Sequence, residues 1–259
     1  MKIAVTGKGG TGKSTITGIM AHFLAGEGYK VLAVDADPDA NLAEALGLPA
    51  DLADSIVPIS EQRALIKERT GANPKEFGQL FKMNPTVDDI PDRYCVDFRG
   101  IRLLVMGAVR KGGAGCACPE NVLLKSLLSD IILKRREAVL VDMEAGVEHL
   151  GRASSKSIDQ MLIVVEPGLR SIKTAERIMA MGKELGILCF GIIGNKIQTR
   201  EQMDWIAKQL PGRQIHGMIS YHDRIRDADL SQKPLIDSMN GEIEIEFRDV
   251  YNSIKRNLC

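Results

Sequence analysis

The chain has 259 residues, of which 44% are hydrophobic and 26% charged, and its 34 Lys and Arg residues balance 34 Asp and Glu residues. This composition is typical of a globular protein that is long enough to bury a sizeable core. Zero net charge and the lack of a long apolar run argue against nucleic-acid and membrane partners, and the lack of an apolar N-terminal signal segment predicts a cytoplasmic protein.

Short apolar runs alternate along the chain with segments of helical spacing, which is the pattern of a parallel sheet flanked by helices. Most runs lack period-two alternation, as expected for strands that are covered on both faces. Strands are predicted near residues 2–6, 30–34, 101–106, 138–141, 160–165, 189–194 and 214–218. Helices are predicted near residues 13–26, 119–135, 170–185, 199–210 and 243–257. The expected fold is α/β with a mostly parallel central sheet.

The alternation of strands and helices is interrupted between about residues 50 and 99. Four prolines, Pro58, Pro74, Pro85 and Pro91, divide this mostly polar stretch. We interpret it as an insertion of short helices. Neither an internal repeat nor a low-complexity tract is evident, which favours one domain over residues 1–259.

A Gly-rich loop joins the first predicted strand to the first predicted helix. Its sequence, Gly7-Lys8-Gly9-Gly10-Thr11-Gly12-Lys13-Ser14, fits the pattern G-x-x-x-x-G-K-[ST] in the strand-loop-helix setting that this pattern requires. Glycines let backbone N–H groups turn toward phosphate oxygens, and the helix N-terminus adds positive potential. The loop predicts a P-loop NTPase in which Lys13 contacts the β and γ phosphates and Ser14 holds Mg²⁺. The expected ligands of ATP and ADP are Gly9, Gly10, Thr11, Gly12, Lys13, Ser14 and Thr15.

A second lysine, Lys8, directly follows the first glycine of this loop. The loop therefore resembles that of the deviant Walker A class, which includes the nitrogenase iron protein and the MinD and ParA ATPases. In that class the early lysine reaches the nucleotide bound by the partner protomer. The resemblance implies a homodimer that hydrolyses ATP to ADP and phosphate. From its chemistry alone, Lys8 could also be a solvated loop lysine, which is the less favoured alternative.

Two carboxylates, Asp35 and Asp37, follow the second predicted strand. They lie at the carboxyl end of a buried strand, where ligands bind in open parallel sheets. Asp37 matches the switch I aspartate of the deviant Walker A class, which implies that it positions or deprotonates the attacking water. Asp35 is expected either to cap this loop or to hold a metal-bound water.

A Cys-x-Cys pair, Cys116 and Cys118, precedes the predicted helix 119–135. A helix N-terminus favours thiolates, which bind soft or borderline metals. Two thiolates do not complete a tetrahedral site of four sulfurs, but a twofold dimer supplies four. The pair therefore predicts a metal site shared by two protomers. The alternatives are buried structural cysteines and a redox-sensing disulfide, which the single intervening residue would strain.

Two later strand ends also carry polar residues. The predicted strand 138–141 ends at Asp142, which is the Walker B pattern of an aspartate that holds Mg²⁺ through water. Asn195 ends the predicted strand 189–194 and matches the position that contacts adenine in the deviant Walker A class. Both residues are therefore candidate members of the nucleotide site.

The Cys-x-Cys pair, the segment 142–152 and the run Glu166-Pro167-Gly168 resemble the CooC family. These nickel-insertion ATPases mature carbon monoxide dehydrogenase, and related factors serve acetyl-CoA synthase. The resemblance covers nearly the whole chain and is weakest in the 50–99 insertion. It implies nickel or zinc bound between protomers by Cys116 and Cys118, coupling to the nucleotide state, and one of these two enzymes as client.

Two other functions are compatible with the same fold. A positioning ATPase of the MinD or ParA kind would carry a basic amphipathic C-terminal helix or a basic DNA-binding patch. The apolar stripe of helix 243–257 instead opposes a face of mixed charge, which favours docking on the domain. An iron–sulfur electron-transfer ATPase would need a cluster cysteine in the segment 142–152, which contains none.

Overall fold

The computed structural model describes residues 1–74, 76, 78–107, 118–135, 137–146, 150, 155–230, 234–239 and 241–258. Its strands are β1 (Lys2–Gly7), β2 (Val31–Asp35), β3 (Val96–Phe98), β4 (Ile101–Val105), β5 (Ala138–Asp142), β6 (Gln160–Val165), β7 (Phe190–Ile197) and β8 (Gln214–Ser220). Within these residues the strands form an eight-stranded sheet in the order β3-β4-β2-β5-β1-β6-β7-β8. Neighbouring strands are parallel, except that β3 pairs antiparallel with β4. The predicted α/β class with a mostly parallel sheet is confirmed.

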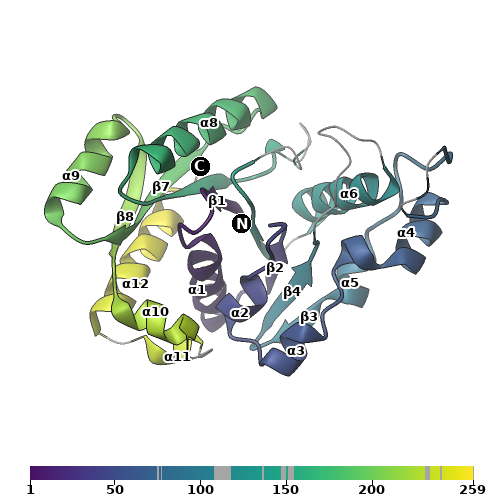
Figure 1. The fold of residues 1–259 in the computed structure, drawn as a ribbon, viewed down its shortest axis with the longest axis horizontal. Helices are drawn as coiled ribbons and strands as arrows, with labels where there is room; N and C mark the ends of the chain where they lie inside the picture. The colour runs from purple at the N-terminus through teal and green to yellow at the C-terminus, as the bar shows by residue number, and fades with distance from the viewer. Residues whose placement is uncertain are drawn as a thin grey trace.

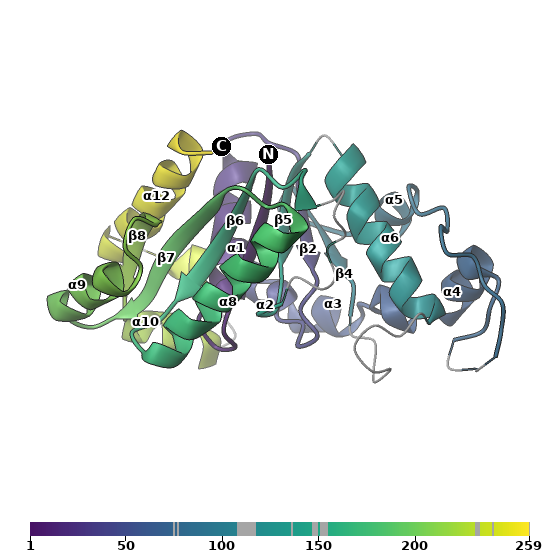
Figure 2. The same cartoon turned by 90° about the horizontal axis from the view of Figure 1, so that it is seen from above.

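Helices cover both faces of the sheet (Figures 1 and 2). One face carries α6 (Pro119–Lys134), α8 (Leu169–Leu185) and α9 (Arg200–Gln209). The other carries α1 (Lys13–Gly26), α2 (Leu42–Leu46), α10 (Asp223–Leu230), α11 (Leu235–Ser238) and α12 (Gly241–Arg256). In the described part of the chain, none of the helices is both long and apolar enough to cross a membrane.

The strands supply two hydrophobic clusters, because successive side chains of a strand point to opposite faces of the sheet. In β1, Ala4 packs in the cluster under α6 and α8, whereas Ile3 and Val5 pack in the cluster under α1 and α12. Every residue of β2 and β5 is buried. Burial on both faces explains why these strand sequences show no polar alternation.

The stretch interpreted as an insertion contains short helices and also the edge strand β3. Its helices are α3 (Ala50–Asp54), a 3-10 turn (Ile59–Glu61), α4 (Arg63–Thr70) and α5 (Ile90–Tyr94). Figure 1 places α4 and α5 at the end of the sheet away from α9. The sequence does not predict β3, because its three residues are half-buried or exposed and form no apolar run.

Polar residues gather at the edge of the sheet where the parallel strands end. The register pairs Asp35 of β2 with Asp142 of β5. It also pairs Gly7 of β1 with Val164 of β6, so Lys8 and Glu166 both follow just beyond this edge. Open parallel sheets bind ligands outside the carboxyl ends of their strands, and the sequence candidates converge at that place.

Candidate nucleotide site

The loop between β1 and α1 has the backbone shape of a phosphate cradle. Gly10 and Gly12 have φ angles of 79° and 93°, a left-handed conformation that a residue with a Cβ rarely adopts. Thr11 is buried and its hydroxyl donates to the Lys8 carbonyl at 2.8 Å, which holds the turn closed. Gly9 and Gly10 are exposed, and Ser14 and Thr15 lie in the first turn of α1. The predicted nucleotide ligands are thus contiguous on this loop and helix.

Lys13 is buried and forms an ion pair with the partly buried Asp37. The Lys13 Nζ lies 3.2 Å from Asp37 Oδ2, and the two side chains are 7% and 13% exposed. The loop that carries Asp37 is capped by Asp35, which accepts the backbone N–H of Leu42 at 2.9 Å and that of Asp37 at 3.2 Å. Of the two roles expected for Asp35, the structure shows capping. Nucleotide phosphates would compete with Asp37 for the Lys13 ammonium.

Burial changes the protonation of two adjacent carboxyl groups. Burial raises the pKa of Asp35 to about 7, and the nearby Asp142 carboxylate adds to the rise. Burial likewise raises the pKa of Asp142 to about 6, against the hydrogen bond from Ser14 and the positive charge of Lys13, which lower it. A cation bound near these two carboxyl groups would stabilise their ionised forms and lower both pKa values.

The arrangement of Ser14 and Asp142 fits a magnesium ion. The Ser14 hydroxyl donates to Asp142 Oδ2 at 2.5 Å. The buried Oδ1 of Asp142 has no hydrogen-bond partner among the described residues. A hydroxyl and a carboxylate oxygen are ligands that Mg²⁺ prefers, and an unpartnered buried oxygen is readily satisfied by a cation or its bound water. The predicted Mg²⁺ residues therefore lie together.

Lys8 contacts a residue of its own chain that sequence reasoning did not assign to the site. Its Nζ lies 2.7 Å from Glu166 Oε1, and the two side chains are 39% and 26% exposed. Glu166 follows the end of β6, which is the neighbour of β1 in the sheet. The sequence signal for Glu166 is a carboxylate directly after an apolar run, but this signal places Glu166 at the site only when the order of the strands is known.

Asn195, expected to contact adenine, contacts the P-loop in this structure. Its side-chain nitrogen donates to the Thr11 carbonyl at 2.7 Å, and the residue is 7% exposed. A Cβ on Gly12 would collide with this amide, so the close approach requires glycine there. Asn195 thus supports the loop, and its contact with adenine stays a prediction.

Of the predicted metal-binding pair, Cys116 lies outside the described residues and Cys118 lies at the N-cap of α6. Cys118 is half-buried, with extended backbone, and Pro119 is the first residue of the 16-residue helix. The Cys118 thiol is therefore at a helix N-terminus, as expected, where the helix dipole favours the thiolate. Over the described ranges, no three His, Cys, Asp or Glu side chains form a group suited to a metal ion.

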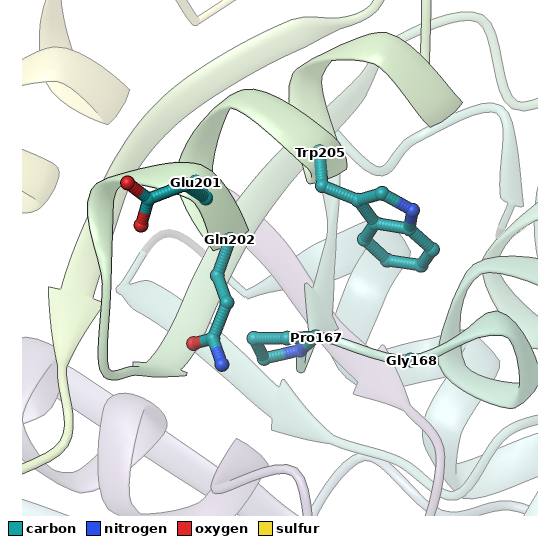
Figure 3. A pocket seen from close by; sticks show the side chains of 5 residues that line it. All are labelled: Pro167, Gly168, Glu201, Gln202 and Trp205. Atoms are coloured by element: carbon teal, nitrogen blue, oxygen red, sulfur yellow. The ribbon is translucent and has the colours of Figure 1, made fainter.

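An open cavity of about 310 Å³ lies beside Glu166, between the start of α8 and α9. Its lining residues are Pro167, Gly168, Glu201, Gln202 and Trp205. Figure 3 shows the Gln202 side chain extending toward Pro167, the Trp205 ring above the Pro167–Gly168 segment, and Glu201 turned away from Pro167. Leu169, the next residue after Gly168, is 60% exposed. A largely apolar surface thus adjoins the residue that holds Lys8.

Residues 2–235 match the family described as the CobQ/CobB/MinD/ParA nucleotide binding domain. The chain belongs to this nucleotide-binding family. It is 48% identical over 229 residues to the carbon monoxide dehydrogenase accessory protein CooC of Rhodospirillum rubrum, covering 88% of this chain and 87% of that protein. It is 41% identical over 256 residues to an uncharacterised ATP-binding protein of Methanocaldococcus jannaschii, covering 98% and 97%. The resemblance to CooC-type deviant Walker A ATPases and the predicted ATPase activity are confirmed.

Solved structures of the same family share the fold of this CobQ/CobB/MinD/ParA domain. A chain of the MinC:MinD cell division protein complex of Aquifex aeolicus superposes with a TM-score of 0.68 at 22% identity, covering 99% of this chain and 96% of that chain. A ParA family ATPase of Chlorobium tepidum gives a TM-score of 0.69 at 20% identity, covering 97% of both chains. At this identity the likeness concerns the fold alone.

Proposed function

We propose that this ATPase is a metallochaperone that carries nickel and inserts it into carbon monoxide dehydrogenase or acetyl-CoA synthase. The observation that carries the proposal is the 48% identity to a carbon monoxide dehydrogenase accessory protein over 88% of the chain. The position of Cys118 at the N-terminus of α6 supports a thiolate metal site. Zinc is the other ion that such thiolates would bind. The proposed place of action is the cytoplasm.

The nucleotide chemistry is assigned to residues of the P-loop and the neighbouring strand ends. Lys13 binds the β and γ phosphates of ATP, together with backbone N–H groups of the loop and the N-terminus of α1. Ser14 and Asp142 hold Mg²⁺, which neutralises phosphate charge when it is bound. Asp37 leaves Lys13 when the phosphates arrive and then positions or deprotonates the attacking water. Asn195 contacts the adenine.

The proposed active unit is a homodimer in which Lys8 reaches the partner's nucleotide. Such a movement first breaks the contact between Lys8 and Glu166, which are partly exposed. The exposed Leu169 and the cavity next to Trp205 adjoin this contact, so a partner that meets Lys8 would also cover this apolar surface. Trp205 is the single tryptophan of the chain, and its emission would report this burial.

The proposed cargo site uses Cys116 and Cys118 from both protomers. Two thiolates per chain become four in a twofold dimer, which completes a tetrahedral sulfur site. The pair comes after β4, whereas Asp37 comes after β2, the neighbouring strand. Because the two protomers would share the metal, coupling of the metal site to the nucleotide would pass through rearrangement of the two subunits.

The packing of α12 argues against a membrane-positioning ATPase. Its apolar stripe of Ile243, Phe247, Val250, Tyr251 and Ile254 is buried in the core. That face is therefore not available to a lipid surface. The segment 142–152 contains no cysteine, which disfavours an iron–sulfur electron-transfer ATPase.

Activation of a nickel-free client tests the proposed function. Nickel-free carbon monoxide dehydrogenase is incubated with limiting Ni²⁺, ATP and this protein, and the oxidation of carbon monoxide is measured. We expect activation that requires ATP and that is lost in the Cys118→Ser variant and in the Lys13→Ala variant. Equal activation by nickel alone, or by the Cys118→Ser variant, would exclude the insertion role for this client. Acetyl-CoA synthase is then tested in the same way.

A further inference from the structure

We propose that Lys196 is a positioning residue for ATP binding, because it fixes the P-loop from the end of β7. The Lys196 Nζ donates to the Gly10 carbonyl at 2.6 Å. These residues are 186 positions apart in the sequence. The partner of the ammonium is a backbone carbonyl of the loop, so in this proposal Lys196 acts on the nucleotide through the backbone.

The backbone around Lys196 is shaped for this contact. Lys196 has a φ of 59°, a left-handed conformation that is unusual for lysine. The pairing of β7 with β8 shifts register between Gly194 and Ile197, on either side of this residue. A bulge of this kind re-aims a side chain at the end of a strand. A conformation that lysine disfavours thus turns its ammonium toward the P-loop.

The preceding residue holds the adjacent peptide unit. Asn195 donates to the Thr11 carbonyl while Lys196 donates to the Gly10 carbonyl. The N–H of Thr11 donates to the Lys8 carbonyl at 3.2 Å, so the peptide unit between Gly10 and Thr11 is fixed at both ends. Because a trans peptide points its N–H opposite to its carbonyl, the hydrogen bond from Asn195 to the Thr11 carbonyl also sets the direction of the Gly12 N–H. Two consecutive side chains therefore preset two consecutive peptide units of the cradle.

Because these contacts already order the loop, the loop loses less conformational entropy when the nucleotide binds. An ammonium bound to a carbonyl is a charge-assisted hydrogen bond, although Lys196 is exposed and water weakens it. Removal of this contact should therefore weaken nucleotide binding about fivefold to tenfold. The turnover number should change less than about threefold, because no group on the reacting phosphates is lost.

The test compares the Lys196→Asn and Lys196→Arg variants with wild type. Asn adopts the left-handed backbone readily but is too short to reach Gly10, so this variant removes the contact without adding strain. Arg keeps a charged donor. Lys208→Asn, at an exposed position in the last turn of α9, is the control. The dissociation constant of a fluorescent ADP analogue, the KM for ATP and the turnover number are measured for each protein.

We expect Lys196→Asn to raise the dissociation constant and KM about fivefold to tenfold, with Lys196→Arg restoring both to near wild-type values and Lys208→Asn changing neither. The melting temperature of the nucleotide-free protein should be the same for Lys196→Asn and the control. Wild-type affinity in Lys196→Asn would overturn the proposal. A lowered melting temperature, together with a turnover number that falls by the same factor as KM rises, would also overturn it, because that result indicates general destabilisation.

Discussion

The Asp37 Oδ2 lies 3.2 Å from the Lys13 Nζ, so Asp37 and the phosphates of ATP would compete for the same ammonium. The Asp37→Asn change should leave ATP binding intact, because it weakens the competitor of the phosphates. Hydrolysis should fall on the order of 100-fold, the usual loss when a general base is removed. Lys13→Ala should instead abolish ATP binding. Single-turnover hydrolysis and equilibrium binding separate the two effects, and wild-type hydrolysis by Asp37→Asn would exclude its role.

Asp35 predicts a particular pH dependence of stability. Its pKa is about 7 in the folded chain against an ordinary value of 3.8. Between these values the folded state binds the proton more tightly than the unfolded state, so the free energy of unfolding falls as pH rises from about 4 to about 7. The slope attributable to Asp35 is at most on the order of 1 kcal/mol per pH unit.

The Asp35→Asn variant removes this titration. Urea unfolding at pH 5, 6 and 7.5 should show that its stability, relative to wild type, improves steadily as pH rises. Because the Asp142 carboxylate interacts with Asp35, the difference between the two proteins reports the titration of Asp35 together with its coupling to Asp142. For Asp54→Asn, at an exposed position in α3, the free energy of unfolding should change with pH in the same way as that of wild type. Parallel curves for Asp35→Asn would show that the carboxyl of Asp35 is ionised throughout this range.

Residues of the site were predictable where the signal is local. The P-loop, Asp37 and Asp142 sit within or directly after predicted strands, so motif and strand together place them. Glu166 was not assigned, because its contact with Lys8 spans 158 positions and depends on β6 lying next to β1. The contact of Asn195 with Thr11 likewise follows from strand order, which the sequence does not state.

At the scale of elements, α12 is part of the core. Phe247 is 3% exposed and packs in the cluster that includes α1. Phe247→Ala should lower the free energy of unfolding by about 3 kcal/mol, the loss typical of a large buried side chain. Ile245→Ala, at a position 60% exposed on the same helix, should change it little. Urea denaturation measures both, and a near-neutral Phe247→Ala accompanied by lost binding to anionic vesicles would favour the membrane-positioning alternative.

Elements were predictable in proportion to their length and burial. The interior strands and the long helices have boundaries within about three residues of those expected, because each carries a long apolar signal. Within the part of the chain that the structure describes, the elements not predicted are β3, α2, α10 and α11, which are three to eight residues long. Such short elements form through tertiary contacts, as when Pro234 before α11 packs against Gly47 after α2.

At the scale of the whole molecule, the contact between Lys8 and Glu166 opposes the proposed dimer. Glu166→Gln should release Lys8 and strengthen dimerisation with a non-hydrolysable ATP analogue about threefold to tenfold, since two partly exposed ion pairs are weakened per dimer. Glu176→Gln, at an exposed position of α8, is the matched control. Sedimentation velocity measures the dimer fraction. Unchanged dimerisation in Glu166→Gln, or normal dimerisation in Lys8→Ala, would contradict the proposed movement of Lys8.

Nickel affinity in different nucleotide states tests the metallochaperone proposal most directly. Anaerobic calorimetric titration is performed on nucleotide-free, ADP-bound and ATP-analogue-bound protein, for wild type and Cys118→Ser. Wild type should saturate at about half an equivalent of Ni²⁺ per chain, because two chains share one site. Its nickel affinity should differ at least about fivefold between nucleotide states, because a metal that binds one state of the dimer more tightly must also change the affinity for the nucleotide. Cys118→Ser should lose this binding. Identical nickel affinities in all three wild-type states, or saturation at one tight equivalent per chain, would contradict nucleotide-gated transfer of nickel from a shared site.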